Sequence, residues 1–322
     1  MEVQNSQDTD HNPLVSIIVI TYNSAKFVLE TLESAKAQTY QNIELIVSDD
    51  WSTDNTIEIC KQWIQNNKVR FRKTIIVTSK INTGTSSNCN RGFNESTGEW
   101  IKFIAGDDIL HINSIEYFIE YLNNNFSSPQ VVFSKQCNFI DNDTNTRTFT
   151  ETLPRTNDNP LFIDNSSAKD QLQVLLFGRI NIPGPTLLIK SSLLEDIGRF
   201  DEKYGILEDF PLYIKILESN VKFYFLDKTT VYYRIHSLSV TKFDKNEVII
   251  TKFDQLWWKF HFDVISSKVT TVRKWNIIYR YYLTKTMILL GNKNHILRYI
   301  YILALKAQPL SIYNKLSHSY GK

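Results

Sequence analysis

Three pairs of acidic residues lie where apolar segments of the chain begin or end: Asp49-Asp50, Asp107-Asp108 and Glu208-Asp209. A single pair at such a point is as typical of a helix cap or a solvated turn as it is of a functional site. Asp107-Asp108 indicates more, because Gly106 before it lets the backbone approach a ligand closely. Two adjacent carboxylates repel each other unless a cation relieves them, and hard oxygen ligands suit Mg²⁺ or Mn²⁺ bound together with phosphate oxygens.

Such a cation suits a reaction in which a diphosphate leaves, because a divalent ion can stabilise the negative charge that builds up. The same site has to hold a nucleotide. Tyr22 can stack on a base, and the Asp50 carboxylate can accept a hydrogen bond from a base N–H. Asp209 is the candidate for the group that deprotonates an acceptor hydroxyl. His236 alone is typical of a structural histidine, but beside the acidic pairs it becomes a candidate third contact of the metal or the diphosphate.

The elements that must position these residues alternate between strand and helix over the first 125 residues. Four apolar β-branched runs predict strands at Val15–Ile20, Ile43–Val47, Thr74–Val77 and Trp100–Ala105. Helical spacing of apolar residues follows each run, at Ser24–Ala37, Asp54–Ile64, Thr85–Asn94 and Asn113–Asn124. The alternation predicts an α/β fold with a mostly parallel sheet and helices on both faces. Ligands of such sheets bind beyond the carboxyl ends of the strands.

Later parts of the chain are less regular. Residues 126–180 show no clear pattern, and strand and helix signals return at Gly184–Gly198, Val221–Leu226 and Thr230–Tyr233. Ser52 or Asp54 can cap the second predicted helix. The motifs GxxxxGK[ST], GxGxxG and GxSxG are absent, which argues against P-loop, dinucleotide-binding and α/β-hydrolase sites.

Charge is distributed unevenly along the 322 residues, whose net charge is only +2. Residues 250–322 hold 12 Lys/Arg and 2 Asp/Glu, so this segment carries +10. Arg273–Leu290 and His295–Ala307 mix basic residues with Tyr, Ile and Leu, a composition typical of helices that lie in a membrane interface. The alternative is ordinary packing of these helices on the rest of the protein. Nucleic acid is not expected as a partner, because no recognition motif is present.

Cysteine content and the absence of long apolar runs indicate the compartment. Cys60, Cys89 and Cys137 are widely spaced, and the first two fall in predicted helices, where small buried side chains are usual. This usage favours a reducing cytoplasmic location. Residues 1–12 are polar and are expected to be disordered rather than a signal peptide. No uninterrupted run of about 18 apolar residues predicts a membrane span.

Five segments together carry a resemblance to a known family: VSIIVITYN (15–23), IVSDDWSTDNT (46–56), NCNRG (88–92), GEWIKFIAGDD (98–108) and LED (207–209). They resemble, in this order, the family 2 inverting glycosyltransferases of GT-A fold, over about residues 13–240. Similar proteins most commonly assemble O-antigen or capsule repeat units in bacteria.

The resemblance implies a role for each candidate residue. Those that would hold the nucleotide-sugar donor are Tyr22, Asp50, Arg91, Asp107 and Glu208. Tyr22 and Asp50 would contact the nucleobase, usually uracil, and Asp107 the ribose or the metal. Asp108 would be the principal metal ligand of a DxD-type motif, with His236 closing on the diphosphate. Asp209, in a pair similar to the family's ED motif, would be the catalytic base. Asn90 and Arg91 match a segment that lines the donor pocket.

The sequence departs from the family pattern at Trp51, where family members usually have Gly, and this puts the local turn in question. Arg179–Gly184 lies near where an acceptor would enter. The implied organisation is a disordered segment 1–12, a catalytic domain 13–245, and a basic, aromatic helical region 246–322. Within the catalytic domain, residues 13–110 would bind the donor and residues 111–245 the acceptor.

We expect an inverting glycosyltransferase that moves a sugar from a UDP-sugar to a saccharide acceptor carried on a polyprenyl diphosphate. Mn²⁺ or Mg²⁺ would be the cofactor, and the C-terminal region would hold the enzyme on the cytoplasmic face of the membrane. A nucleotidyltransferase is the first alternative, although a Gly-rich basic loop is missing after the first predicted strand. A catalytically idle module that binds carbohydrate or membrane is the second.

Overall fold

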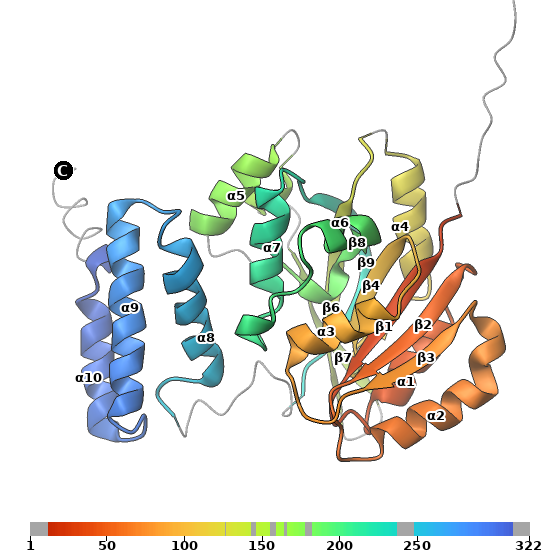
Figure 1. The fold of residues 1–322 in the computed structure, drawn as a ribbon, viewed down its shortest axis with the longest axis horizontal. Coiled ribbons are helices and arrows are strands. Elements are labelled where there is room, and N and C mark those ends of the chain that lie inside the picture. The colour runs from red at the N-terminus through yellow and green to blue at the C-terminus, as the bar shows by residue number, and fades with distance from the viewer. Residues whose placement is uncertain are drawn as a thin grey trace, which may run out of the picture.

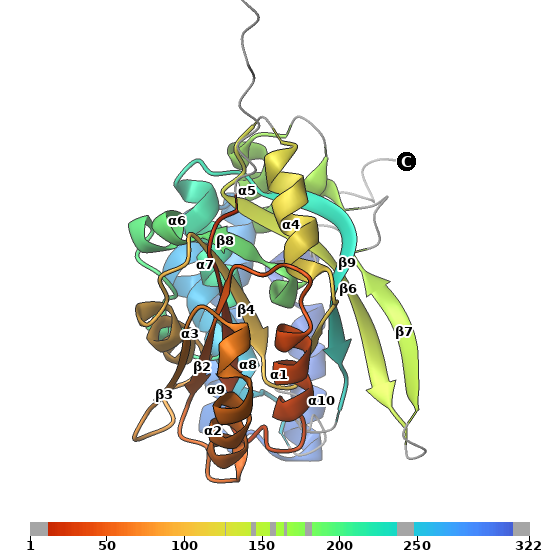
Figure 2. The same cartoon turned by 90° about the vertical axis from the view of Figure 1, so that its right-hand side faces the viewer.

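The computed structural model describes residues 12–125, 127–142, 146–154, 159–163, 166–177, 182–236 and 248–311. The predicted disordered segment therefore lies outside the described residues except for Asn12. A single sheet of nine strands runs through the molecule in the order β3-β2-β1-β4-β8-β6-β9-β5, and β7 pairs with β6 at the margin (Figures 1 and 2).

The N-terminal half of the sheet is parallel. It consists of β1 (Val15–Thr21), β2 (Ile43–Asp49), β3 (Thr74–Thr78) and β4 (Trp100–Ala105). β2 is buried at every position and β1 at all but one, as expected for apolar strands covered on both faces. The alternation with helices continues through α1 (Val28–Lys36), α2 (Thr56–Asn67), α3 (Thr85–Asn94), the short β5 (Ile109–Leu110) and α4 (Ser114–Asn123). The α/β fold predicted from the sequence is confirmed.

The C-terminal half makes the sheet mixed. Its strands are β6 (Val131–Asp141), β7 (Arg147–Leu153), β8 (Leu188–Lys190) and β9 (Tyr224–Arg234). β8 lies antiparallel between β4 and β6, whereas β6 and β9 are parallel. The helices of this half are α5 (Ala168–Phe177), α6 (Ser191–Asp196) and α7 (Asp209–Glu218). The region 126–180, which showed no clear pattern in the sequence, thus contains an eleven-residue strand that is paired on both sides.

Two hydrophobic cores lie on opposite faces of the sheet. One core joins the sheet to α1, α2 and α4 and contains Cys60, and the other joins it to α3, α5, α6 and α7 and contains Cys89. Both cysteines are buried and unpaired, as predicted. The first helix starts at Val28 rather than at Ser24, because residues 24–27 form a turn in which Ser24 O accepts from Phe27 N. The predicted cap Asp54 accepts from Thr56 N, while Ser52 bonds elsewhere.

The C-terminal helices are α8 (Lys252–Phe260), α9 (Thr271–Leu289) and α10 (His295–Lys306), with a π-helical turn at His261–Ile265. They stand beside the sheet in succession, with α8 nearest to α7 and α10 outermost (Figure 1). α8 packs on the body through Trp257, whose ring centroid lies 5.0 Å from that of Phe210. No described helix combines the length and the apolar content that crossing a membrane requires.

Candidate active site

The carboxyl ends of β1, β2 and β4 bring three loops together at one edge of the sheet. Asp50 N donates to Thr21 O over 3.0 Å, and Gly106 N donates to Ile20 O over 2.8 Å. Tyr22, Asp50 and the Asp107-Asp108 turn are therefore neighbours, as the sequence predicted. Packing of the loop itself requires Gly106, in addition to the close approach of a ligand that the sequence predicts. A Cβ there would lie 2.8 Å from Thr21 Cγ2 and 3.1 Å from Ser24 Oγ, so the glycine lets the loop pack against β1.

The two carboxylates of the Asp107-Asp108 turn differ in environment. Asp108 is 1% exposed, and its Oδ1 accepts from Arg234 N over 2.9 Å. The side chain of Asp107 is 29% exposed, and its Oδ2 lies 2.9 Å from Nε2 of His236. The His236 ring packs at a tilt of 43° against that of Phe27, at the turn before α1, with 4.6 Å between the ring centroids. The structure thus brings His236 to the acidic turn, and the side chain of this turn that solvent reaches is that of Asp107.

The fit of a divalent cation to this turn can be tested on the carboxylate of Asp108. Its Oδ2 is buried without a hydrogen-bond partner in the described structure. Burial, and then the negative charge of Asp107, hold the pKa of the Asp108 carboxyl well above its ordinary value. A cation would satisfy the orphaned oxygen and offset the repulsion. Since no three metal-binding side chains cluster in the part of the chain described, phosphate oxygens and water would have to complete the ligand shell.

Arg234 organises the acidic turn, and the sequence analysis assigned it no role. Its guanidinium is buried between the rings of Phe27 and Phe139, 4.7 Å from each centroid. Nε donates to Asp107 O over 2.7 Å, while the terminal nitrogens pair with Asp141 and Glu30. The buried cation therefore holds the backbone of the turn from behind. A buried arginine at a strand end carries no local signal, because its partners lie up to 204 residues away.

Asp50 and Arg91 form one network with the loop before α3. The Asp50 carboxylate accepts from Thr83 N at 3.0 and 2.9 Å and from Gly84 N at 2.7 Å. Arg91 NH2 lies 3.2 Å from Asp50 Oδ1 and donates to Thr83 Oγ1 over 2.7 Å. Both predicted donor-binding residues are therefore engaged in shaping the wall of this edge. Asn90 lies farther back, where its side chain bonds Phe200 O and Glu202.

The turn at Trp51 keeps its shape despite the bulky residue. Asp49 Oδ2 accepts from Ser52 N over 2.8 Å and closes the turn, while the backbone of Trp51 takes a left-handed φ of 68°. This conformation explains why glycine is usual at the position. The substitution therefore leaves the turn intact and adds an exposed indole beside Asp50.

The third acidic pair opens α7. Burial raises the pKa of Asp209 to about 6, whereas the nearby Tyr213 hydroxyl, although not in hydrogen-bonding geometry, acts to lower it. Glu208 has a buried Oε2 without a hydrogen-bond partner among the described atoms. Its own burial, followed by the charge of Asp209, raises its pKa well above the ordinary value. Carboxylates of this kind are typical of general bases and of polar groups that await a ligand.

A short 3₁₀ turn, Gly184–Thr186, connects this pair to the acidic turn after β4. A Cβ on Gly184 would lie 2.7 Å from Cγ of Asp209, so the carboxylate rests against a bare Cα. On the other side, Lys102 of β4 donates to the carbonyl oxygens of Pro185 and Leu187. Burial lowers the pKa of Lys102 to about 7, and the charge of Asp108 opposes this shift. Lys102 thus lies within electrostatic reach of Asp108 and fixes the turn that supports Asp209. Residues 179–181 of the segment expected near the acceptor lie outside the described residues.

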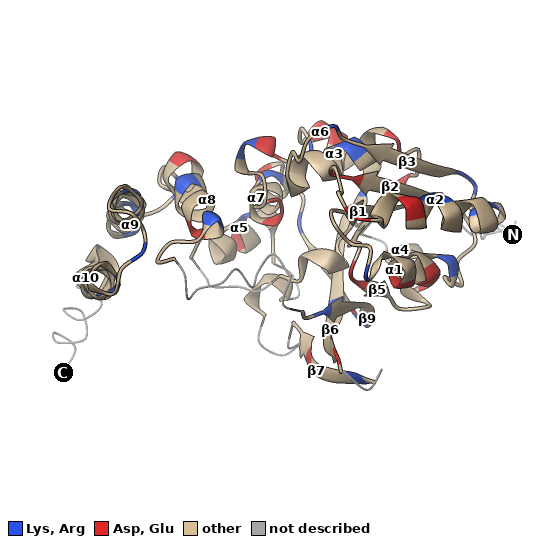
Figure 3. Cartoon of the chain, turned by 90° about the horizontal axis from the view of Figure 1, so that it is seen from below, with Lys and Arg blue, Asp and Glu red and all other residues tan. Residues whose placement is uncertain are grey.

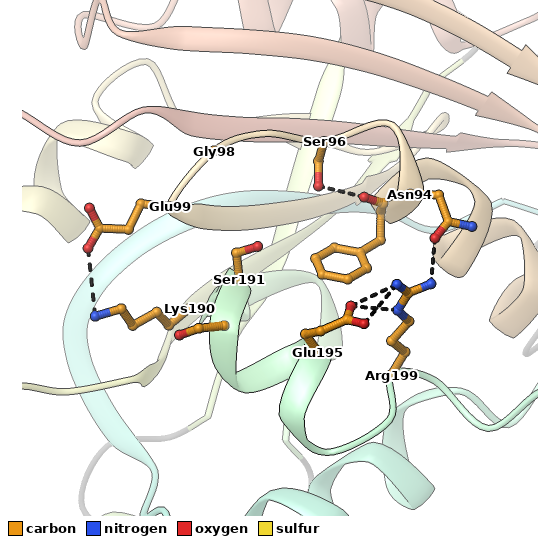
Figure 4. A pocket seen from close by; sticks show the side chains of 10 residues that line it. Asn94, Ser96, Gly98, Glu99, Lys190, Ser191, Glu195 and Arg199 are labelled. Carbon is orange, nitrogen blue, oxygen red and sulfur yellow. Dashed lines mark hydrogen bonds and ion pairs between the residues drawn. The ribbon is translucent and has the colours of Figure 1, made fainter.

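A cavity of about 550 Å³ lies away from these residues (Figure 4). It is lined by the end of α3, the loop between α3 and β4, the end of β8, and α6 with the turn after it. Its charged groups are paired with one another, as Arg199 is with Glu195 at 2.8 Å and Lys190 with Glu99 at 3.8 Å. None of the candidate site residues lines this cavity.

Comparisons with known proteins agree with the arrangement. The family model described as Glycosyl transferase family 2 matches residues 16–192. A glycosyltransferase of Rickettsia typhi is 31% identical over 254 residues, which are 78% of this chain and 72% of the relative. The Escherichia coli enzyme WfaP, a UDP-Glc:alpha-D-GlcNAc-diphosphoundecaprenol beta-1,3-glucosyltransferase, is 27% identical over 73% of this chain and 83% of its own.

Solved structures resemble the fold at lower identity. TarS residues 1–349 of S. aureus, in complex with UDP-GlcNAc, superpose with a TM-score of 0.58 at 18% identity, over 84% of this chain and 72% of that one. The mannosyltransferase PcManGT of Pyrobaculum calidifontis, in complex with GDP-Man and Mn²⁺, gives 0.56 at 16% identity, over 92% and 75%. Because the family model covers more than half of the chain and the Rickettsia relative matches most of it, this protein belongs to glycosyl transferase family 2 and has the GT-A fold.

Proposed function

We propose that the protein is an inverting glycosyltransferase that moves a sugar from a UDP-sugar to a hydroxyl group of a saccharide acceptor. The observation that carries the proposal is the shared support of two acidic centres. Lys102 and the turn at Gly184 join the Asp107-Asp108 turn to Asp209, whose pKa is raised to about 6. WfaP, by its name a UDP-glucose enzyme, and TarS, solved with UDP-GlcNAc, support a UDP-sugar as the donor.

The reaction would proceed in one displacement. The acceptor hydroxyl attacks the anomeric carbon, Asp209 takes the hydroxyl proton, and the bond between that carbon and the UDP oxygen breaks. Inversion then converts an α-linked donor into a β-linked product. A pKa near 6 leaves Asp209 mostly deprotonated at neutral pH, yet basic enough to receive the proton.

The leaving diphosphate would lie at the Asp107-Asp108 turn. Bound Mn²⁺ or Mg²⁺ would supply neutralisation of the charge that develops there. Asp108 would hold the cation through its unpartnered Oδ2, and His236 would face the diphosphate from its place beside Asp107. Among the proposed donor contacts, Tyr22 and Asp50 would contact the nucleobase, with Arg91 paired to Asp50 in the wall of the donor pocket. Glu208 would lie beside the sugar.

A donor screen tests the proposal. UDP-sugars and GDP-sugars are incubated with the full-length protein, with and without Mn²⁺, and the released nucleotide is measured. Release of UDP from one sugar nucleotide, reduced to a residual rate in Asp209→Asn with UDP binding retained, is the expected result. Release of pyrophosphate would indicate a nucleotidyltransferase instead. Near-normal turnover by the Asp209→Asn variant would refute the assignment of the base.

The acceptor is proposed to be linked to a polyprenyl diphosphate, which requires the enzyme to work at a membrane. The outer face of α9 and α10 fits this requirement. α10 is largely apolar yet has no buried residue, and Ile296 on it is 69% exposed. Leu289, at the end of α9, is 86% exposed. A helix that is apolar on most sides but packed on one needs a further apolar partner.

Charge favours anionic lipid over a second copy of the chain as that partner. Residues 264–311 contain eight Lys/Arg and no Asp/Glu, and the ribbon of α9 and α10 in Figure 3 accordingly has no segment in the colour of acidic residues. Two copies meeting through this face would bring cation to cation. An anionic bilayer surface would instead attract each basic residue and accept the apolar ones.

Vesicle binding tests this face. The protein should sediment with vesicles containing phosphatidylglycerol and much less with pure phosphatidylcholine. The Leu289→Ser, Ile296→Ser double variant should lose this binding, whereas Val69→Ser, which removes a side chain that is 92% exposed on the body, should not. Equal sedimentation of all three proteins, or a dimer in solution that only the double variant loses, would contradict the proposal.

The biological setting follows from these parts. A UDP-sugar transferase with a lipid-binding face and a relative that acts on GlcNAc-diphosphoundecaprenol suits the assembly of O-antigen or capsule repeat units. We place it on the cytoplasmic face of the cell membrane, where sugar nucleotides are available. Fractionation of cells that express the tagged protein would check this location.

A further inference from the structure

Trp51 combines backbone strain with an exposed and unpartnered side chain. Its φ of 68° lies in the left-handed region, which is strained for a residue other than glycine. Its side chain is 48% exposed, and the indole has no hydrogen bond or ring contact with any residue that the structure describes. Nothing in the fold itself is thus seen to benefit from a large aromatic residue here. Strain of this kind, when it is retained, points to a function.

Hydrogen bonds fix the backbone of the turn that carries the indole. Asp49 is buried and accepts from Ser52 N over 2.8 Å, and Ser52 Oγ accepts from Asn23 N over 2.8 Å. Thr53 N also donates to Asn23 Oδ1 over 2.8 Å. The loop that carries Trp51 is therefore clamped to the loop after β1, in which Tyr22 is 49% exposed. Two exposed aromatic residues stand on adjoining loops at the same edge of the sheet.

The position of these rings relative to the acidic turn suits a nucleotide. The strand order β2-β1-β4 places Trp51 two strands away from Asp107, which is about 10 Å at the usual spacing. A nucleoside diphosphate that lies along this edge with its phosphates at the acidic turn would extend its base over the loops after β1 and β2. Asp50, which precedes Trp51, directly follows the last residue of β2.

We propose that Trp51 is a nucleobase-binding residue, whose indole covers the base of the bound nucleoside diphosphate together with Tyr22. This inference rests on the proposed function and adds Trp51 to the residues that would contact the nucleobase. Stacking of a base on an aromatic side chain contributes substantially to binding and needs no hydrogen-bond partner. The left-handed turn carries the indole to the edge of the sheet where the base would lie, at the expense of backbone strain.

The test measures two quantities that should move in opposite directions. Trp51→Gly should bind UDP about tenfold more weakly by calorimetry, which is about 1.4 kcal/mol, with and without Mn²⁺. The same variant should unfold at an equal or higher temperature, because glycine relieves the left-handed backbone. Trp51→Phe should bind UDP within about threefold of wild type, since a ring remains for stacking. Uridine without phosphates should show the same loss in Trp51→Gly as UDP.

A control variant separates the backbone from the ring. Asn220→Gly makes the same kind of substitution at an exposed left-handed residue, φ 65°, at the end of α7, and should leave UDP affinity unchanged. Unaltered UDP affinity of Trp51→Gly, or a clear fall in its unfolding temperature, would overturn the inference. If instead the wild-type protein bound no nucleoside diphosphate, the proposed function itself would fail.

Discussion

Gly184→Ala should disable the proposed base without touching the nucleotide site. The added Cβ would lie 2.7 Å from Cγ of Asp209 and closer still to one carboxylate oxygen. Ordinary contact begins at 3.4 Å, so the carboxylate has to move by at least 0.7 Å. Displacing a reacting group by about 1 Å can cost about 10²-fold in rate, equivalent to about 2.7 kcal/mol of transition-state stabilisation. We therefore expect kcat/KM to fall by about two orders of magnitude.

The assay is release of UDP in the presence of donor and acceptor, with UDP affinity measured separately by calorimetry. UDP affinity should stay within about twofold, because Gly184 lies on the side of the base. A double-mutant cycle provides the control. In the Asp209→Asn background, Gly184→Ala should cause no further loss, since the group that it displaces is already inactive. Activity of Gly184→Ala within threefold of wild type, or a full additional loss in that background, would refute the reasoning.

Four further outcomes are expected. Because burial raises the pKa of Asp209 to about 6 and the base acts deprotonated, kcat/KM should fall as the pH drops through about 6. The same desolvated charge should make Asp209→Asn melt above wild type at about pH 8, with the difference shrinking towards about pH 4. A chelator should lower turnover, and Asp108→Asn should abolish any gain in UDP affinity on adding Mn²⁺. Arg234→Lys should lose about 2 kcal/mol of stability in urea unfolding, because an ammonium cannot replace the stacked guanidinium fork. A kcat/KM that does not change between about pH 7 and pH 5, an Asp209→Asn variant that melts no higher than wild type at about pH 8, unchanged turnover with chelator or an unchanged urea midpoint would contradict these expectations in turn.

Local patterns were sufficient to predict the parallel half of the fold. The bounds predicted for α3 and β4 agree with the structure at both ends. The reason is that a strand covered on both faces has to be apolar along its length, and Gly84 and Gly106 mark the turns beside these elements. β6 was missed because polar residues such as Ser134, Lys135 and Gln136 interrupt its apolar run, although most of the strand is buried in the sheet. A strand with buried polar residues has neither the continuous apolar run nor the strict alternation that reveals a strand in the sequence.

The sequence by itself determined which residue types could carry the chemistry: the acidic pairs, Tyr22 and the basic, apolar C-terminal helices. These features can be recognised in the sequence because the charge and hydropathy of a residue follow from its type and do not depend on its neighbours. Only the tertiary structure decided how they work together. It placed the buried guanidinium of Arg234 behind the acidic turn, pressed Asp209 against Gly184 and gave Trp51 a left-handed backbone. These are contacts or conformations imposed by segments distant in sequence, so their energies exist only once the sheet has formed.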